Sequence, residues 1–372
     1  FTYDWEQRKL DAAAKFSKGN GYSKRDLIES GTPIILYGRL YTKYETSISD
    51  VDTYVEAKEG SIYSKGGEVI VPASGETADD IARAATIDKS GILLGGDLNV
   101  VMPNEDINPA FLAISISNGN SQRELAKKAQ GKSVVHIHNE DIGNLIVPFP
   151  TKAEQNKIVD YFSNIDNLIT LHQRKLQHIK DFKKAMLQKM FPKKGEKYPE
   201  IRFPEFTDAW EQRKFGDVGS VAMCKRIFKG QTSDKGEVPF YKIGTFGGKP
   251  DAFISRELFN EYKTKYPYPN KGDILISASG SIGRTVEFTG KDEYFQDSNI
   301  VWLKHESEID NNFLKVLYSV VEWSCEGSTI KRLYNDNFLK TEFMLPQIDE
   351  QIKLGTFFAS LDNLITLHQR EF

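Results

Sequence analysis

The chain has 372 residues, of which 39% are hydrophobic and 12% aromatic, and its formal net charge is −3. This length fits two or three domains, and the apolar content excludes a disordered chain. No apolar run approaches the roughly 20 residues that a membrane-spanning helix needs. Cys224 and Cys325 provide neither a zinc motif nor a disulfide framework. We therefore expect a cytoplasmic protein with two buried thiols and no membrane segment.

The sequence contains a long internal repeat. Phe1–Lys9 matches Phe206–Lys214 at seven of nine positions, and Asp166–Arg174 recurs letter for letter as Asp362–Arg370. The offset between the copies is therefore 205 residues at the first match and 196 at the second. A leader, Tyr198–Glu205, precedes the second copy only. We expect that the first copy has lost a similar leader and that the chain is trimmed at both ends.

Each copy begins with an α/β head, residues 1–150 and residues 206–346. Short apolar runs bounded by glycine and turn residues predict strands, and Asn108 and Asn312 each begin a predicted helix. The predicted strands are Pro33–Tyr37, Glu68–Val71 and Leu98–Met102 in the first head, and Pro239–Ile243, Asp273–Ile276 and Ile300–Leu303 in the second.

A long helix follows each head, over residues 151–192 and 347–372, and residues 193–205 form a linker. Thr151 and Glu154 have capping-box spacing, and Pro192 ends the first helix. The first helix would be roughly 60 Å long, too long to bury an apolar seam against itself. The repeated helix is the expected partner, and the predicted helix-pair interface is a heptad seam. Its residues are Ile158, Phe162, Ile165, Ile169, Leu176 and Ile179, facing Leu354, Phe358, Leu361 and Ile365.

Two polar side chains interrupt this seam, His172 (repeated as His368) and Lys183. We interpret the histidine as a packed or register-setting residue rather than as a ligand. Substituting Phe162→Asp together with Phe358→Asp should then separate the helices and leave each head folded.

Nucleotide-binding motifs are absent from the sequence. Neither a phosphate-binding loop of the Gly-x-x-x-x-Gly-Lys-Ser/Thr type nor a Gly-x-Gly-x-x-Gly turn after a strand occurs. Asp251, Glu261 and Lys263 have an order that can hold Mg²⁺ and position a water molecule in nucleases. A stand-alone Mg²⁺-dependent nuclease is therefore one alternative function, and a coiled-coil adaptor whose heads bind protein is another.

The heads favour nucleic-acid binding, because their predicted loops mix basic, aromatic and hydroxyl side chains. Lys and Arg neutralise phosphates, and Arg, Ser and Thr also contact base edges. In the first head the candidates are Lys24, Arg25, Arg39, Tyr41, Lys43, Tyr44, Ser74 and His136. In the second head they are Lys225, Arg226, Lys229, Thr232, Lys242, Thr245, Ser277, Ser279, Ser281, Arg284, Lys331, Arg332 and Tyr334.

Three motifs resemble those of type I restriction-modification specificity subunits. They are Trp-Glu-Gln-Arg-Lys at the start of each head, the run from Gly272 to Arg284, and the spaced pattern from Leu345 to Ile365. The first head departs from the second motif, with Gly67-Glu68 in place of Gly-Asp and Pro72–Thr77 in place of Ser-Ala-Ser-Gly-Ser-Ile.

This resemblance implies two globular α/β target recognition domains, joined by two long antiparallel coiled-coil helices in a pseudo-twofold repeat. Each domain would read one half of a bipartite site in double-stranded DNA. The helices would act as a spacer and dock two methyltransferase subunits, with restriction/translocase subunits joining outside them. The chain itself would be non-catalytic and without a cofactor, and S-adenosylmethionine, ATP and Mg²⁺ would bind to the partner subunits.

Overall fold

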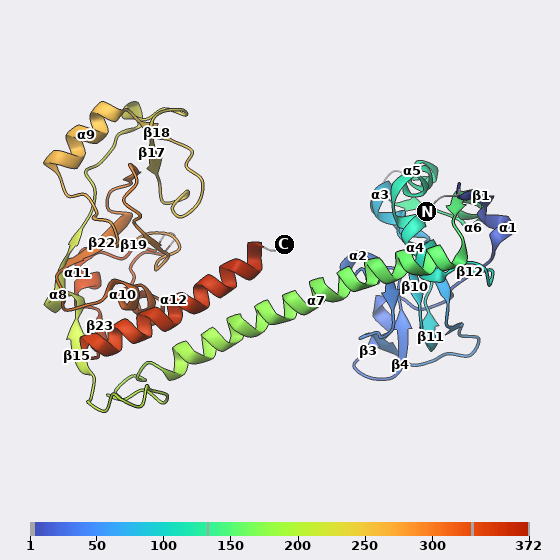
Figure 1. The fold of residues 1–372 in the computed structure, drawn as a ribbon, viewed down its shortest axis with the longest axis horizontal. Helices are drawn as coiled ribbons and strands as arrows, with labels where there is room; N and C mark the ends of the chain where they lie inside the picture. Colours follow the sequence, from blue (N-terminus) through green and yellow to red (C-terminus); the bar gives the residue numbers. More distant parts are fainter. Residues whose placement is uncertain (1–3, 132–133, 329–330, 371–372) are drawn as a thin grey trace. The chain divides into compact units, whose positions relative to one another are not determined.

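The computed structural model describes residues 4–131, 134–328 and 331–370. The chain divides into two compact units, unit 1 (Phe1–Ile169) and unit 2 (Thr170–Phe372). Unit 1 contains the first head and the first part of the long helix α7 (Lys152–Lys189), and unit 2 contains the rest of α7, the linker, the second head and helix α12 (Ile348–Arg370). Figure 1 shows the ribbon of each unit.

Unit 1 is built from short strands and short helices that precede α7. Its strands are β1 (Glu6–Lys9), β2 (Ala14–Lys18), β3 (Leu27–Ile28), β4 (Thr32–Ile35), β5 (Ser47–Ile48), β6 (Tyr54–Val55), β7 (Tyr63–Lys65), β8 (Glu68–Pro72), β9 (Ser74–Gly75), β10 (Ala85–Ile87), β11 (Ser90–Leu94), β12 (Leu98–Pro103), β13 (Val135–His136) and β14 (Ile146–Phe149). Its shorter helices are α1 (Leu10–Ala13), the 3₁₀ turn η1 (Lys24–Asp26), α2 (Arg39–Thr42), α3 (Ala78–Ile81), α4 (Pro109–Ser117), α5 (Gly119–Lys128) and α6 (Asn139–Gly143).

Two five-stranded sheets form the centre of unit 1, in the orders β2-β12-β8-β10-β5 and β3-β6-β4-β11-β7. Strand β8 is buried along its whole length, which explains its nearly continuous apolar sequence. Its first residue, Glu68, is 4% exposed and accepts the backbone N–H groups of Lys65 and Gly66. Gly66 and Gly67 have φ values of +91° and +89°, a conformation that favours glycine. The glutamate that replaces aspartate in the first head therefore stabilises the turn before β8.

The head of unit 2 is also built from short strands and short helices. Its strands are β15 (Glu211–Lys214), β16 (Gly219–Ala222), β17 (Val238–Tyr241), β18 (Phe253–Ile254), β19 (Ile274–Ser277), β20 (Thr285–Glu287), β21 (Tyr294–Phe295), β22 (Ile300–His305) and β23 (Glu342–Leu345). Its shorter helices are α8 (Phe215–Val218), the 3₁₀ turn η2 (Lys229–Gln231), α9 (Arg256–Lys265), α10 (Asn311–Val320) and α11 (Asn335–Lys340).

Two hydrophobic cores lie in unit 2. One core surrounds the β18-β17-β21 sheet and α9, and it includes Phe240, Phe259 and Tyr294. The other core lies between the β16-β22-β19-β20 sheet, α10 and α12, and it includes Trp210 and Phe313. Helix α9 lies at the end of the unit opposite α12 (Figure 1).

The repeat in the sequence is visible as a repeat in structure. Strand β1 pairs with β14 in an antiparallel register that joins Glu6 to Phe149, and β15 pairs with β23 in the register that joins Glu211 to Leu345. These pairs differ by the same offsets, 205 and 196, that relate the two copies of the sequence. In both units the Glu-Gln-Arg-Lys strand therefore lies beside the strand that leads into the long helix.

Helices α7 and α12 pack antiparallel within unit 2. The rings of His172 and His368 are 5.8 Å apart, and the rings of Phe182 and Phe357 are 6.4 Å apart. Residue numbers rise along α7 as they fall along α12, which gives the antiparallel direction. Lys183, the second polar residue of the seam, pairs with Asp362 at 2.5 Å. Pairing of the two helices is thus observed where both belong to one unit.

The predicted seam is only partly a helix–helix seam. Leu354, Phe358 and Leu361 are buried in the core of unit 2, where Phe358 is 0% exposed and its ring lies 6.2 Å from that of Phe191. An aspartate at position 358 would enter this core, so the expectation that Phe358→Asp leaves the head folded is wrong. Of the α7 residues, Ile179 packs against the same core and Leu176 is half-buried.

Of the remaining seam positions, four lie on the part of α7 in unit 1, and Ile365 lies on α12 in unit 2. Ile158 packs against the core of unit 1, and Ile165 and Ile365 are half-buried. Phe162 and Ile169 are 45% and 39% exposed. The apolar face of α7 therefore packs on the head in each unit as well as on α12.

No helix in the described part of the chain has both the length and the apolar character to cross a membrane.

Candidate nucleic-acid interface

A tight loop follows β19 in unit 2, over residues 277–284. The hydroxyl of Ser277 donates to the backbone oxygen of Ser281 at 2.6 Å and accepts the N–H of Arg284 at 2.9 Å. Gly280 and Gly283 have positive φ values of +66° and +90°. Because Ser277 is 0% exposed, it closes the loop rather than presenting its hydroxyl to a ligand.

A second segment, described over residues 326–328 and 331–334, lies against the first. The N–H of Gly280 donates to the backbone oxygen of Lys331 at 3.1 Å, and the N–H of Leu333 donates to that of Ala278 at 2.8 Å. Ser279 is 5% exposed and donates its hydroxyl to Asn299 Oδ1 at 2.7 Å. These bonds bring the predicted residues Ser281, Lys331 and Arg332 to one surface, where all three are exposed.

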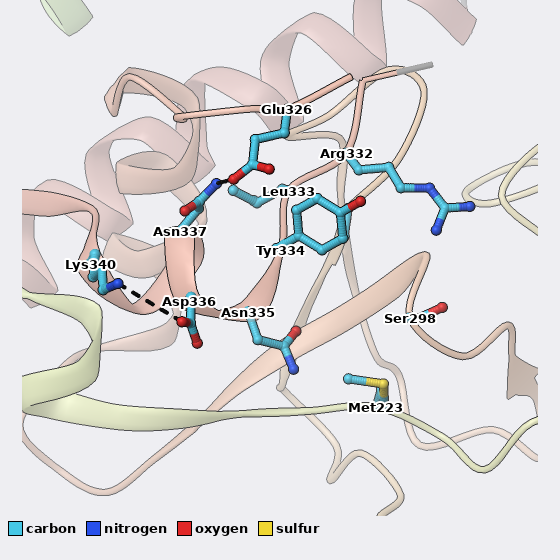
Figure 2. A pocket seen from close by; sticks show the side chains of 11 residues that line it. Met223, Ser298, Glu326, Arg332, Leu333, Tyr334, Asn335, Asp336, Asn337 and Lys340 are labelled. Atoms are coloured by element: carbon cyan, nitrogen blue, oxygen red, sulfur yellow. Dashed lines mark hydrogen bonds and ion pairs between the residues drawn. The ribbon is translucent and has the colours of Figure 1, made fainter. Parts of the chain in front are cut away.

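This surface borders a hollow of about 710 Å³, shown in Figure 2. Arg332, Tyr334 and Asn335 line it on one side, and Met223 and Ser298 line it on the other. Ion pairs and hydrogen bonds fix part of the wall, since Asn337 donates to Glu326 at 2.9 Å and Lys340 lies 3.8 Å from Asp336. The Tyr334 ring is 49% exposed. An exposed aromatic ring beside a guanidinium group and amides is chemistry that suits stacking on bases and contact with phosphate.

Lys225 and Arg226 follow Met223 along the chain. Arg226 lies 3.8 Å from Asp297, next to Ser298 of the hollow, and Lys225 lies 4.9 Å from the centre of the Tyr266 ring. Both side chains are exposed. They extend the basic surface beyond the hollow.

Most of the remaining candidates of unit 2 form internal contacts. Arg284 donates to the backbone oxygen of Ile243 at 2.7 Å and stacks over Phe246 at 5.5 Å. Lys242 pairs with Asp251 at 2.9 Å. Thr232 donates to the oxygen of Lys229 and Thr245 to that of Lys242, so these two hydroxyls stabilise turns. The side chain of Lys229 is exposed.

In unit 1 the structure brings Tyr41, Ser74 and His136 together. The Tyr41 hydroxyl donates to the backbone oxygen of Ser74 at 2.7 Å, and Ser74 Oγ lies 3.1 Å from His136 Nδ1. Burial raises the pKa of the Tyr41 phenol well above its usual range, so this group stays a hydrogen-bond donor. Ser74 is 8% exposed, whereas His136 is exposed. Of the three, His136 presents the most surface to a ligand.

Arg39 does not have the geometry of a free phosphate ligand. Its side chain is 8% exposed and pairs with Glu45 at 2.7 Å and with Asp52 at 2.8 Å. Lys43 also pairs with Asp52, and the hydrogen bond from Lys43 lowers the pKa of the Asp52 carboxyl. Tyr44 donates to the backbone oxygen of Ala84 at 3.1 Å. We infer that Arg39 stabilises the fold of unit 1.

Lys24 and Arg25 occupy η1 and are exposed. Among the other candidates of unit 1, His136 is exposed on β13, and Lys43 and Tyr44 are exposed after the end of α2. The role of Lys24, Arg25 and His136 as DNA contacts stays a prediction.

Both units match one family of known proteins. The profile described as "Type I restriction modification DNA specificity domain" matches residues 3–181 and residues 207–371. The chain belongs to this family. A putative type I restriction enzyme specificity subunit of Haemophilus influenzae is 41% identical over 274 residues, which cover 72% of this chain and 69% of the relative. The type I restriction enzyme MjaVIII specificity subunit of Methanocaldococcus jannaschii is 23% identical, over 99% of this chain and 88% of the relative.

Solved structures show the same fold. A type I restriction-modification S subunit from M. genitalium superimposes with a TM-score of 0.60 at 14% identity, covering 100% of this chain and 92% of that one. A chain from a study of assembly and conformational transition of a type I restriction-modification system superimposes with a TM-score of 0.57 at 16% identity, covering 99% and 92%. The predicted fold class is confirmed.

Type I specificity subunits are non-catalytic, and the catalytic activities of these systems reside on other subunits. The family therefore gives no support to the nuclease alternative, and the contacts of the three residues give none either. Asp251 pairs with Lys242, Glu261 with Lys265 and Lys263 with Asp292. Within residues 4–131, 134–328 and 331–370, no contact joins two of the three predicted nuclease residues.

Ser298, which lines the hollow, was missed in the sequence analysis. Ser298 has a φ of +48°, which is uncommon for a residue other than glycine. Its neighbour Asp297 forms an ion pair with Arg226, and its neighbour Asn299 accepts a hydrogen bond from Ser279. The signal in the sequence was the run of three small polar residues directly before the apolar strand β22.

Proposed function

We propose that this specificity subunit reads a bipartite double-stranded DNA site, one half with the loops of unit 1 and the other with the loops of unit 2. In unit 2 the reading surface would comprise the loop 277–284, residues 326–328 and 331–334, the hollow beside Tyr334, and Lys225 with Arg226. In unit 1 it would comprise Lys24, Arg25 and the region of His136.

One observation carries this proposal. The two units share the family profile and the same strand register at the base of the head, yet their exposed loops carry different side chains. To recognise two different half-sites, the two heads need different base-contacting side chains, while the fold that positions these side chains can stay the same. The exposed basic groups would neutralise phosphates, and Arg332 and Tyr334 would contact bases.

The long helices would serve as the spacer and as the docking surface for methyltransferase subunits. The repeated segment exposes the same leucines in both copies, Leu168 and Leu171 at 56% and 62%, and Leu364 and Leu367 at 45% and 54%. Exposed apolar side chains that recur in a stripe are typical of a protein-binding surface. Because the surface occurs twice, we propose two methyltransferase subunits, with restriction/translocase subunits outside them.

The chemistry would come from these partners. S-adenosylmethionine, ATP and Mg²⁺ would bind to them, and the complex would act in the cytoplasm, where a prokaryotic chromosome lies. The domain boundaries that accompany this proposal are residues 1–150 and 206–346 for the readers, 151–192 and 347–372 for the helices, and 193–205 for the linker.

The test uses the chain assembled with its methyltransferase subunits. Sequencing of methylated adenines with and without the gene identifies the site, and fluorescence anisotropy then measures binding to duplexes in which either half-site is scrambled. Arg332→Ala should weaken binding to the intact site. Scrambling one half-site should then no longer lower the affinity further, while scrambling the other half-site should still lower it.

Lys265→Ala is the matched control, since it removes an exposed cation of α9 that pairs with Glu261 at i and i+4. In this control variant, scrambling either half-site should lower the affinity as much as it does in the unsubstituted chain. The affinity should fall steeply with salt, because phosphate contacts release counterions. Equal loss at both half-sites in Arg332→Ala would contradict the division of labour, and salt-independent binding would favour the adaptor function.

A further inference from the structure

The same short 3₁₀ turn occurs in both units. The turns η1 and η2 are related by the offset of 205 that relates the starts of the two heads. In each unit the residue before the turn donates its backbone N–H to a side chain three residues further on. Ser23 donates to Asp26 Oδ2 at 2.7 Å, and Phe228 donates to Gln231 Oε1 at 2.9 Å. Gln231 also donates to the Tyr262 hydroxyl of α9 at 3.4 Å, which fixes the turn of unit 2 to the head.

The side chain that precedes the turn differs between the units. In unit 1 the Ser23 hydroxyl accepts the N–H of Arg25 at 3.3 Å, which is the ordinary role of a serine at such a position. Phe228 has no atom that could accept this bond. Its ring is 61% exposed and lies outside the two hydrophobic cores of unit 2. Neither the turn nor a core therefore explains a phenylalanine at this position.

Cations surround this exposed ring. The Arg226 guanidinium lies 5.9 Å from the centre of the Phe228 ring, and the side chain of Lys229 is exposed directly after it. Arg226 also lies 3.8 Å from Asp297, whose neighbour Ser298 lines the hollow of Figure 2. The Phe228 ring is thus joined through one arginine to the edge of the proposed reading surface.

An apolar ring among cations has the chemistry of a contact with nucleic acid. Phosphates lie on the outside of a duplex and would neutralise the cations, and the faces of the bases inside it are apolar. Phenylalanine is one of the side chains that proteins insert between base pairs as a wedge. A purely apolar protein surface would cover the ring, but it would leave the cations beside the ring without partners.

We propose that Phe228 inserts its ring at one base step of the half-site that unit 2 reads and unstacks that step. Arg226 and Lys229 contact the phosphates beside it. Ser23 cannot act in this way, so the corresponding step of the other half-site stays stacked. Because pyrimidine–purine steps unstack most easily, the wedge adds a preference for such a step. This inference rests on the proposed function, since it requires that unit 2 binds DNA.

The experiment uses the chain assembled with its methyltransferase subunits and duplexes of its site that carry 2-aminopurine at successive positions. The fluorescence of this base is quenched in stacked DNA and rises when a neighbouring step is unstacked. Methyltransferases extrude their target base, which gives a signal of its own in both half-sites. We therefore expect one additional signal, in the half-site of unit 2 only, that depends on Phe228.

Phe228→Ser places the residue of unit 1 in unit 2. Serine is favoured before a helical turn, so the stability of unit 2 to urea should stay unchanged or rise. The additional fluorescence signal should disappear, and the affinity for the intact site should fall about tenfold, a factor in the range for one lost stack on a base. Phe228→Trp should keep both the signal and the affinity. Tyr198→Ser is the control, because it removes a 55% exposed aromatic ring of the linker, and it should change neither.

Two results would overturn the inference. One is unchanged fluorescence and affinity in Phe228→Ser. The other is unchanged fluorescence together with loss of the methyltransferase subunits from the complex in size-exclusion chromatography, which would identify the ring as a protein contact. Both results leave recognition of the two half-sites in the unsubstituted chain intact. Failure of the proposed function itself would differ, since the unsubstituted chain would then bind intact and scrambled duplexes equally.

Discussion

Gln351 makes in unit 2 the three hydrogen bonds that Gln155 makes in unit 1. Gln155 accepts the N–H of Asn108 at 2.7 Å and donates to the backbone oxygens of Pro150 at 3.0 Å and Asp106 at 3.4 Å. Gln351 accepts the N–H of Asp310 at 2.9 Å and donates to those of Pro346 at 2.9 Å and Glu308 at 3.2 Å. Both side chains are 1% exposed. Each long helix is thereby fixed to the N-cap residue of a helix in its head, Asn108 of α4 in unit 1 and Asp310 of α10 in unit 2.

Removal of this amide should destabilise one unit at a time. Gln351→Ala leaves a buried N–H and two buried carbonyl groups without partners, at a cost of about 1–3 kcal/mol. Urea unfolding followed by hydrogen exchange should show the loss in unit 2, and Gln155→Ala should show it in unit 1. Asn363→Ala, at an exposed position of α12, is the control. Equal destabilisation of both units by either variant would argue against this role.

The sequence predicted the elements whose apolar pattern is long. Strands β8, β12, β19 and β22 lie where apolar runs predicted them, because strands that are buried on both faces must be apolar throughout. Strands of two residues, such as β5 and β6, were not predicted, since two residues carry no periodicity.

The heptad pattern identified the long helices but not what each apolar residue contacts. Phe358 continues the period of the seam, yet it packs against Phe191 in the core of unit 2. A period of 3.5 residues indicates that one face of the helix is apolar. It does not indicate whether another helix or a globular domain covers that face. The same applies to the candidate site, because the sequence does not show whether a basic side chain is exposed or ion-paired. Arg332 is exposed, whereas Arg39 is paired with Asp52.

The ion pair between Lys183 and Asp362 should couple α7 to α12. The side chains are 25% and 43% exposed, so the coupling should be modest, about 0.5 kcal/mol, and should weaken with salt. A double-mutant cycle with Lys183→Ala and Asp362→Ala measures it from urea unfolding of unit 2. Lys184→Ala, an exposed neighbour, should show no coupling to Asp362→Ala. A coupling free energy of zero at low salt would contradict the ion pair between Lys183 and Asp362.

The two thiols should differ in reactivity. Burial raises the pKa of Cys224 from its ordinary value of 9.0 to about 12, whereas Cys325 is only partly buried. At pH 8 Cys325 should therefore be alkylated by iodoacetamide while Cys224 is not, as peptide mass spectrometry would show. Because the native pKa is the higher one, this group's contribution to stability is complete below pH 9 and is lost as the pH rises towards 12. Cys224→Ala should remove the loss of stability that ionisation of this thiol causes at alkaline pH. Rapid alkylation of Cys224 in the native protein would show that the thiol is not buried.

Arg39→Ala and Arg284→Ala should have opposite consequences for fold and DNA binding. Arg39 pairs with Glu45 and Asp52, which are 44% and 64% exposed, so its loss should destabilise unit 1 by about 1 kcal/mol. The salt dependence of DNA binding should not change. Arg284 is exposed and fixes the backbone of Ile243, so its loss should release the 242–246 loop and weaken discrimination at the half-site of unit 2.

Urea unfolding and anisotropy with half-site-scrambled duplexes distinguish the two outcomes for this pair. Arg284→Lys should not restore discrimination, because an ammonium group cannot reproduce the planar stack over Phe246 while it donates to Ile243. A loss of half-site discrimination in Arg39→Ala at unchanged stability would show instead that this guanidinium leaves its carboxylates to contact DNA.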